Sequence, residues 1–275
     1  MRRKSDPGSE TQQQPEDFLS NSSFFRSAAD AWQQQRRRER LSTSSEHLDD
    51  LLSGGLETGE ITQFYGSPNS GKTHLCHLLC VVLPSQYQAI YIDTEGTFRK
   101  GKVESIVQAR GLDSKSILQN IQVAQPKNTK QQESCIEEAC STLETTNSKI
   151  KLLILDSMMF HYKQEYSGRS GLSERAHRLN IYIYMYKLRN LAQRNNIAVV
   201  ITNHTTVNPD AFEYANPQPF GGNLVSYTST YIISLKRRKM NGIEATLIKS
   251  PLRGYVWHPL SIAESGFYDI NFVNT

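Results

Sequence analysis

A glycine-rich segment in the first third of the chain has the residue types and spacing of a loop that binds phosphate. Gly66 and Gly71 stand five positions apart, and Lys72 and Thr73 follow directly. Glycines let backbone amides surround phosphate oxygens, and the amino end of a following helix adds partial positive charge. In this complete Walker A motif, Lys72 would reach the β- and γ-phosphates of ATP and the Thr73 hydroxyl would bind Mg²⁺. We expect ATP and Mg²⁺ as cofactors. The expected ATP-binding residues of the loop are Gly66, Ser67, Pro68, Asn69, Ser70, Gly71, Lys72 and Thr73.

Two carboxylates farther along the chain could complete a site for hydrolysis. Asp156 ends the apolar segment KLLIL, as in a Walker B strand, and there it could hold the Mg²⁺. Glu95 lies just past a second apolar segment, AIYI. We expect Glu95 to act with Lys72 in catalysis, as the general base or as the group that positions water. Asp93 is the second choice for this role, and a surface acid without a role is the alternative interpretation of Glu95.

Hydrophobic periodicity and turn residues indicate alternating strands and helices around these residues. The expected strands are residues 60–65, 89–93, 121–124, 151–156 and 197–202. One expected helix is capped by Ser44 or Ser45 and runs through Leu48, Leu51 and Leu52. The other expected helices are residues 74–83, 103–110, 131–146 and 173–195. Segments 231–235 and 244–249 would form a final hairpin that turns at Asn241–Gly242. The alternation predicts an α/β fold, a P-loop NTPase core with a mostly parallel central sheet flanked by helices and a C-terminal β-hairpin.

Composition narrows the class of protein. The 275 residues suffice for one sizeable domain with flanking segments, and 37% of them are hydrophobic, as a packed core needs. The sequence contains no run of about 18 apolar residues and no signal-peptide pattern. We therefore expect an intracellular protein that does not bind membranes, cytoplasmic if archaeal and nuclear if eukaryotic. The net charge is only +4, and the basic runs at 36–38 and 236–239 fit a solvated surface as well as contacts with nucleic acid.

Several further residues are expected to be structural. The four cysteines lack zinc spacing, and Cys76 and Cys80 share a helix face that should be buried. Packing in the core or at an interface is expected for a cluster on the long helix, Tyr182, Tyr184, Met185, Tyr186 and Leu188. No metal-spaced partner accompanies three histidines, His74, His77 and His161.

Five segments together resemble the archaeal and eukaryotic strand-exchange recombinases, the RadA branch of the RecA family. The resemblance covers roughly residues 25–270. It rests on the lead-in 49–62, the segment YIDTEGTFR at 91–99, the stretch from Leu155 to Ser173, the segment ITNH at 201–204, and the edges of a loop at 208–212 and 220–223. Their common order makes the resemblance specific. It implies a RecA-like core that forms an ATP-dependent filament on single-stranded DNA and pairs it with double-stranded DNA.

The resemblance also implies roles for residues outside the phosphate loop. Arg169 and Arg175 match basic positions of the family's first DNA-binding loop and would contact phosphate. In the second loop, about 205–222, Phe212 would insert between bases, and backbone amides including those of Gly221 and Gly222 would capture phosphate. Ordinary packing is an equally good interpretation of that loop's aromatic residues.

Two further ATP-binding positions depart from the family pattern. Lys102 stands where an arginine stacks on adenine, and it lacks a planar group. His204 replaces the usual sensor glutamine, so its response to the γ-phosphate would depend on pH.

The resemblance further implies contacts between protomers. Phe25 and Ala28 match a Phe-x-x-Ala linking motif, in which Phe25 would fill an apolar pocket on the next protomer. An intramolecular hydrophobic staple is the alternative. Pro251 is the one retained residue of the segment that caps a neighbour's ATP. We expect a disordered polar tail at 1–23, an oligomerisation anchor and linker helix at 24–40, and a RecA-like ATPase core at 41–275.

Three functions stay open from the sequence. The first is a DNA-dependent ATPase of recombination and repair, possibly slow, that forms or modulates filaments. The second is a RadB-like accessory protein that binds ATP and a RadA-type recombinase with little turnover of its own. The altered sensor, the altered cap and the missing counterpart of the family's N-terminal helix-hairpin-helix domain favour this paralogue. The third is a RecA-fold ATPase outside DNA metabolism. Self-association as a filament or ring is expected in the first case.

Overall fold

The computed structural model describes residues 27–36, 38–144, 148–166, 172–206 and 218–270. Its contacts divide the chain into two units, residues 1–37 and 38–275. The described part of the first unit consists of Ser27 and helix α1 (Ala28–Arg36), where the Arg36 guanidinium lies 4.6 Å from the centre of the Trp32 ring. Residues 38–275 are called the core unit below.

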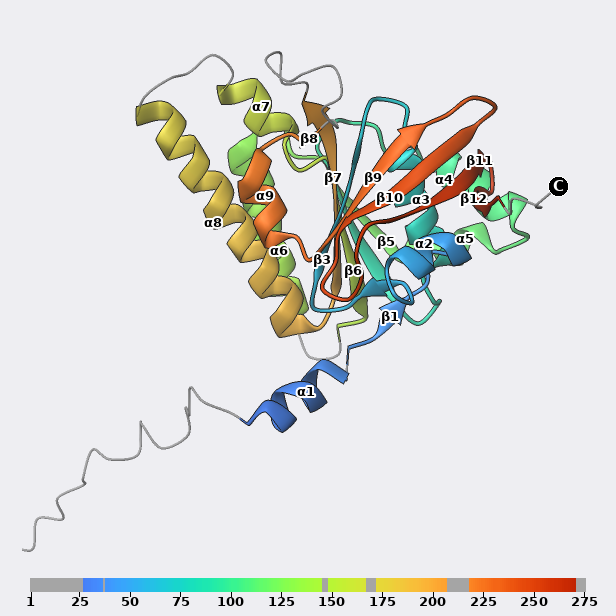
Figure 1. Cartoon of the computed structure of the whole chain (residues 1–275), viewed down its shortest axis with the longest axis horizontal. Helices are drawn as coiled ribbons and strands as arrows, with labels where there is room; N and C mark the ends of the chain where they lie inside the picture. Colours follow the sequence, from blue (N-terminus) through green and yellow to red (C-terminus); the bar gives the residue numbers. More distant parts are fainter. Residues whose placement is uncertain (1–26, 37, 145–147, 167–171, 207–217, 271–275) are drawn as a thin grey trace, which may run out of the picture. The chain divides into compact units, whose positions relative to one another are not determined.

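A ten-stranded sheet, counted over the described residues, organises the core unit (Figure 1). Its six parallel strands follow the order β9-β3-β7-β6-β4-β5. These strands are β9 (Tyr231–Arg237), β3 (Ile61–Gly66), β7 (Ala198–Thr206), β6 (Ile150–Asp156), β4 (Gln88–Asp93) and β5 (Ile121–Ala124). An antiparallel extension continues beyond β9 through β10 (Gly242–Lys249), β11 (Val256–Ala263) and β12 (Gly266–Asp269), and β8 (Gln218–Pro219) pairs with the end of β7.

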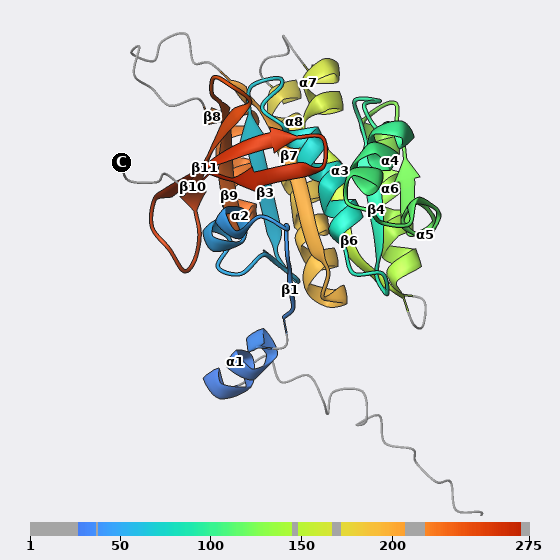
Figure 2. The same ribbon diagram turned by 90° about the vertical axis from the view of Figure 1, so that its right-hand side faces the viewer.

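Helices cover both faces of this sheet. Figure 1 shows one group on each side, and Figure 2 shows α2, α3 and α4 on the side that faces the viewer. One group comprises α2 (Glu46–Leu51), α3 (Lys72–Val82), α4 (Lys100–Ala109) and α5 (Ser114–Gln119). The other comprises α6 (Thr129–Leu143), α7 (Phe160–Tyr166), α8 (Leu172–Asn195) and α9 (Gly222–Thr228). In the described residues, no helix combines the length and the apolar character needed to cross a lipid bilayer.

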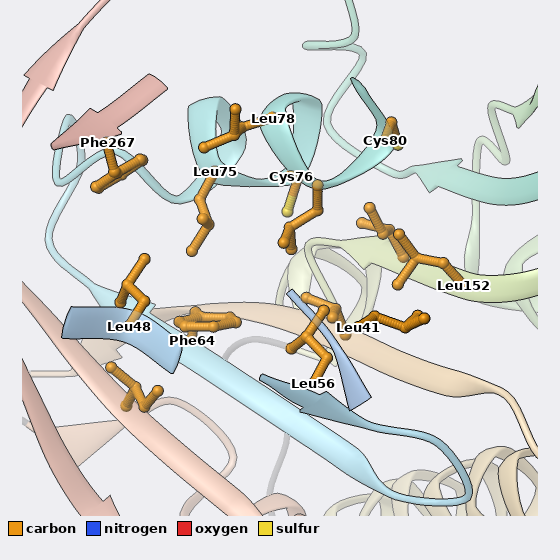
Figure 3. Packing of buried hydrophobic residues seen from close by; sticks show 14 of the residues in the cluster. Leu41, Leu48, Leu56, Phe64, Leu75, Cys76, Leu78, Cys80, Leu152 and Phe267 are labelled. Atoms are coloured by element: carbon orange, nitrogen blue, oxygen red, sulfur yellow. The ribbon is translucent and has the colours of Figure 1, made fainter. Parts of the chain in front are cut away.

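Two hydrophobic cores lie on the two faces because side chains alternate along each strand. On β6, Leu152 and Ile154 belong to the core under α3, whereas Leu153 and Leu155 belong to the core under α8. Figure 3 shows the first core, in which Phe64 of β3 lies among residues from α2 and α3. Strands buried on both faces explain why the sequence of β6 is continuously apolar.

A buried carboxylate holds the short strands β1 (Arg40–Leu41) and β2 (Leu56–Glu57) against the sheet. Glu57 is 6% exposed, and it accepts hydrogen bonds from Arg38 at 3.0 Å, Arg40 at 2.7 Å and the Tyr231 hydroxyl at 2.6 Å. Because three donors converge on one carboxylate, its burial is compensated.

The expected α/β architecture is confirmed, and so is the C-terminal hairpin, with two differences. The turn between β9 and β10 is centred one residue earlier than expected, on Met240 and Asn241, which have φ of 53° and 57°. The sequence also did not predict β11 and β12, which extend the hairpin into a four-stranded antiparallel sheet. Of the two candidate caps for α2, Ser45 accepts the hydrogen bond from the backbone N–H of Leu48.

Candidate functional site

The Walker A segment forms the connection between β3 and α3, as its sequence predicted. Gly66 ends β3, and a Cβ there would lie 2.2 Å from the Leu235 carbonyl oxygen and 2.6 Å from the Ser70 hydroxyl oxygen. Gly71 caps α3 with a φ of 93°, and a Cβ there would lie 2.4 Å from Cδ1 of Ile262. Gly66 is therefore required by packing against backbone, and Gly71 by its positive φ, in addition to the close approach that phosphate needs.

Lys72 begins α3 and is 7% exposed. Its ammonium donates to the carbonyl oxygens of Gly66 and Ser67, each at 2.9 Å, and approaches the Ser70 hydroxyl at 3.3 Å. Burial lowers the pKa of Lys72, while the charges of Asp156 and Glu95 raise it in opposition. A largely buried cation at a helix amino end favours an anion beside it.

Asp156 ends β6 and is 3% exposed. Its carboxylate accepts hydrogen bonds from the hydroxyls of Thr202 and Tyr91, the latter at 2.8 Å. Burial raises the pKa of Asp156, and hydrogen bonds from Thr202, Tyr91 and Thr73 oppose this rise. The structure thus brings together the hydroxyl of Thr73 and a carboxylate, which are the oxygen ligands that Mg²⁺ prefers. These two residues fit the expected metal.

Glu95 follows β4 and carries two hydrogen bonds on one oxygen. Its Oε1 accepts from the Ser157 hydroxyl at 2.6 Å and lies 2.8 Å from Nε2 of His204, at the end of β7. The hydrogen bond with His204 is the main reason that the pKa of Glu95 is lowered, and Ser157 contributes to the same effect, whereas burial opposes it. Glu95 is therefore ionised, as a general base must be.

Asp93, the second choice for the base, holds the loop that carries Glu95. Its carboxylate accepts from the backbone N–H groups of Thr97 and Phe98, each at 2.9 Å, and from the Gln125 side chain at 2.8 Å. These bonds occupy both carboxylate oxygens, so Glu95 is the better candidate for contact with a reacting water.

A cleft of about 1000 Å³ joins these groups. The sequence predicted part of its lining, which includes the loop residues 68–73 together with Glu95, Lys102, Asp156 and His204. It did not predict the contribution of the C-terminal strands, which supply Arg237, Asn241, Ile262, Ala263 and Glu264. The guanidinium of Arg237 donates to the carbonyl oxygen of Asn69 at 3.1 Å. In the sequence, the basic run at 236–239 was the only pattern that drew attention to Arg237.

The expected DNA-binding residues are only partly described. Arg169 and Phe212, and likewise Phe25 of the linking motif, lie outside the described residues. Arg175 is exposed in the first turn of α8, and in Figure 1 the start of α8 and the carboxyl end of β7 both lie on the upper side of the core unit. Gly221 and Gly222, with φ of 85° and 55°, begin α9 beside the same end.

Two hydrogen bonds connect that glycine pair to the nucleotide cleft. The backbone N–H of Phe220 donates to the carbonyl oxygen of His204 at 2.9 Å, and the Asn203 side chain donates to the carbonyl oxygen of Phe220 at 2.6 Å. The end of β7 is therefore tied both to Glu95 and to the segment that leads into α9.

Two of the expected interface residues are described. Ala28 lies in α1 of the first unit, and Pro251 is exposed after β10. A separate pocket of about 120 Å³ lies between the edge strand β5 and α6, and its lining combines apolar residues such as Ile90, Ile92 and Val123 with the polar residues Glu138 and Thr142. The pocket is small enough to hold one or two side chains.

Comparisons with known proteins agree with this arrangement. The family model described as Rad51 matches residues 34–270. The DNA repair and recombination protein RadA of Cenarchaeum symbiosum (strain A) is 36% identical over 246 residues, which are 87% of this chain and 60% of that protein. The chain thus spans about 60% of the length of this relative.

Proposed function

This chain belongs to the Rad51 family, and we propose that it binds ATP with Mg²⁺ and acts on DNA in homologous recombination and repair. One observation carries the proposal. Lys72, Thr73, Asp156 and Glu95 come from three separate segments, and all four line one cleft at the carboxyl end of parallel strands. Parallel sheets bind ligands at that end.

Each residue of the cleft has a role that follows from its position. Lys72 would exchange its carbonyl partners for phosphate oxygens, and Thr73 and Asp156 would hold the metal. When bound, Mg²⁺ neutralises charge on the β- and γ-phosphate oxygens. Glu95 would accept the proton of the attacking water or orient it, and His204 would hold Glu95 in place. Lys102 would supply a further cation without stacking on the base.

ATP turnover with and without single-stranded DNA tests the proposal. We expect DNA to stimulate hydrolysis in the wild type, Lys72→Ala to abolish nucleotide binding, and Glu95→Gln to abolish hydrolysis while nucleotide still binds. Lys100→Ala is the matched control, because Lys100 is an exposed cation of α4 that pairs with Glu104 at 3.3 Å. Hydrolysis that ignores DNA, with no DNA binding at low salt, would support an ATPase outside DNA metabolism instead.

Arg175 provides the test of the DNA surface. Arg175→Ala should weaken binding to single-stranded DNA of any sequence and lower the slope of log affinity against log salt by about one. Arg194→Ala is the control, because Arg194 is also exposed but lies in the last turn of the same helix. Equal effects of the two substitutions would remove Arg175 from the proposed site.

An accessory role with slow turnover is the second candidate, and the histidine at the expected sensor position supports it, because His204 holds Glu95 at Oε1. Ser157 bonds to the same oxygen, so a reacting water would have to use Oε2. An accessory protein would bind a RadA-type recombinase in the presence of ATP, and binding would survive Glu95→Gln. Fast, DNA-stimulated turnover by the purified chain would exclude this role.

We also propose that the chain self-associates through the linking motif. The pocket between β5 and α6 is partly apolar and partly open, since Val123 is 43% exposed, and it could accept Phe25 of another copy. Phe25→Glu and Val123→Glu should each shift the molecular mass measured by light scattering toward the monomer. A mass that stays above the monomer in both variants would assign self-association to another surface.

A further inference from the structure

Helix α8 carries a second apolar face, which the core does not cover. Four residues form it, and they are called the α8 stripe: Leu179, Tyr182, Ile183 and Tyr186. Their side chains are 57%, 52%, 44% and 55% exposed. The spacing of three, four and seven positions places all four on one side of a helix, over a length of about 10 Å.

A different face of α8 packs against the hydrophobic core. Tyr184, Met185 and Leu188 are buried against the sheet, each 1% exposed or less. An amphipathic surface helix needs only one apolar side, and its other side is usually polar. The stripe therefore adds nothing to the described core, and a contiguous exposed apolar patch of this kind marks an interaction surface.

Positive charge surrounds the stripe. Helix α8 holds five cationic residues and one acidic residue, so its net charge of +4 equals that of the whole chain. At 100° per residue, Arg178 and Arg189 lie along one side of the stripe, and Lys187 and Arg194 lie along the other. Lys187 pairs with Glu137 of α6 at 3.0 Å. Arg178, Arg189 and Arg194 form no salt bridge with any described carboxylate.

We propose that the α8 stripe binds an amphipathic helix of a partner protein, with apolar residues on one side and acidic residues on its flanks. Such a helix would bury the stripe and place carboxylates beside Arg178 and Arg189. Leu179 and Ile183 offer no stacking plane, so nucleic acid would leave these aliphatic side chains without a partner. A second copy of α8 would bring the same cations against one another, which is unfavourable. Exposed Tyr side chains among aliphatic ones are common anchors of protein–protein contacts, so the stripe suits a protein ligand.

The test uses the full chain and a labelled synthetic helical peptide with Leu at positions i, i+3, i+4 and i+7 and Glu on both flanks. A second peptide has the same Leu positions with Lys on the flanks. We expect fluorescence anisotropy to show binding of the acidic peptide and at least tenfold weaker binding of the basic one, a ratio worth about 1.4 kcal/mol. Equal binding of both peptides, or no binding of the acidic one, refutes the proposal.

Variants separate the apolar contact from the charge. The double variant Tyr182→Lys, Tyr186→Lys adds positive charge, which by itself would strengthen binding of the acidic peptide. If the acidic peptide nevertheless binds about tenfold more weakly or worse, the loss must come from the missing apolar contact. The double variant Arg178→Glu, Arg189→Glu should weaken the acidic peptide and strengthen the basic one. Leu112→Lys is the control, because Leu112 is a 46% exposed apolar residue outside the stripe and its replacement should leave binding unchanged.

Other occupants give distinct results. The Tyr182→Lys, Tyr186→Lys variant can also be tested against single-stranded DNA and anionic lipid vesicles. If the variant binds one of these more weakly than the wild type does, but binds the acidic peptide equally well, the stripe is the site for that ligand and the proposal is wrong. A stripe-dependent dimer of the wild type would refute it as well. Circular dichroism checks the fold of each variant. ATP binding should persist in all of them, so failure of this proposal is distinguishable from failure of the nucleotide site.

Discussion

Replacing His77 with Phe should remove a pH dependence of stability that the structure builds into α3. His77 is 2% exposed, and neither ring nitrogen has a hydrogen-bond partner among the described residues. Its ring stacks on Tyr91 at a centroid distance of 5.7 Å and meets the edge of Phe98 at 5.2 Å. Burial is the main cause that lowers the pKa of His77 from 6.5 to about 4. Phe can keep both ring contacts without two unpaired polar atoms.

The sign and size follow from proton binding. Between pH 6.5 and about 4, the unfolded chain binds a proton at His77 and the folded chain does not, so stability falls as pH falls. Well below pH 4, this lowering of the pKa from 6.5 to about 4 corresponds to a loss of about 3 kcal/mol of stability. Between pH 7.5 and 5, the part from His77 is about 2 kcal/mol by the same linkage. At pH 7.5, the ring is largely neutral in both states and this contribution is close to zero.

Urea unfolding followed by circular dichroism at pH 7.5 and pH 5 provides the measurement. Other titrating groups are common to the two proteins, so the difference in unfolding free energy between His77→Phe and wild type isolates the imidazole. We expect this difference to grow by about 2 kcal/mol in favour of His77→Phe on going from pH 7.5 to 5. An unchanged difference would show that the ring is hydrated or that its neighbours rearrange, and would refute the reasoning.

Three further predictions concern stability and the pH profile. Glu57→Ala should cost about 1–3 kcal/mol in urea unfolding, because the buried Tyr231 hydroxyl and the partly buried Arg40 lose their acceptor, while Arg38 keeps Glu60. A cost below about 0.5 kcal/mol would mean that water replaces the carboxylate. Gly66→Ala should lower the melting temperature and abolish nucleotide binding. Gly101→Ala, whose Cβ would meet open space in α4, should instead raise stability by up to about 1 kcal/mol. Similar effects of the two substitutions would contradict the close approach at Gly66. His204→Ala removes the hydrogen bond that is the main cause of the lowered pKa of Glu95. The acid limb of the pH profile of ATP hydrolysis should therefore move to higher pH. An acid limb that does not move would show that His204 does not set the protonation of Glu95.

The phosphate loop and the two carboxylates could be predicted because their signals are local. The glycines of the loop are fixed by backbone geometry within eight residues, and Asp156 and Glu95 each follow a buried strand, whose carboxyl end faces the cleft. Parallel strands bring such ends together whatever the connections between them. The same logic placed most of the sheet correctly.

The rest of the cleft depends on contacts that no local pattern contains. Arg237 and Ile262 reach the loop because β10, β11 and β12 fold back antiparallel beside β9, and β11 carries a proline and polar residues that weaken its strand signal. The bond between His204 and Glu95 joins residues 109 positions apart. On α8, Tyr184 and Tyr186 have the same residue type, yet one is 1% and the other 55% exposed. Periodicity shows two apolar faces and does not say which one the sheet covers.

The end of β7 is the described connection between the nucleotide cleft and the proposed DNA-facing segment before α9. Thr202 bonds to Asp156, and His204 bonds to Glu95 through its side chain and to Phe220 through its carbonyl oxygen. A backbone shift at His204 would displace the carbonyl oxygen that anchors Phe220, which leads into the glycines at the start of α9. If nucleotide changes DNA affinity by this route, DNA must change nucleotide affinity by the same factor. His204 lies at that junction, so we expect its replacement to affect this coupling more than either affinity alone.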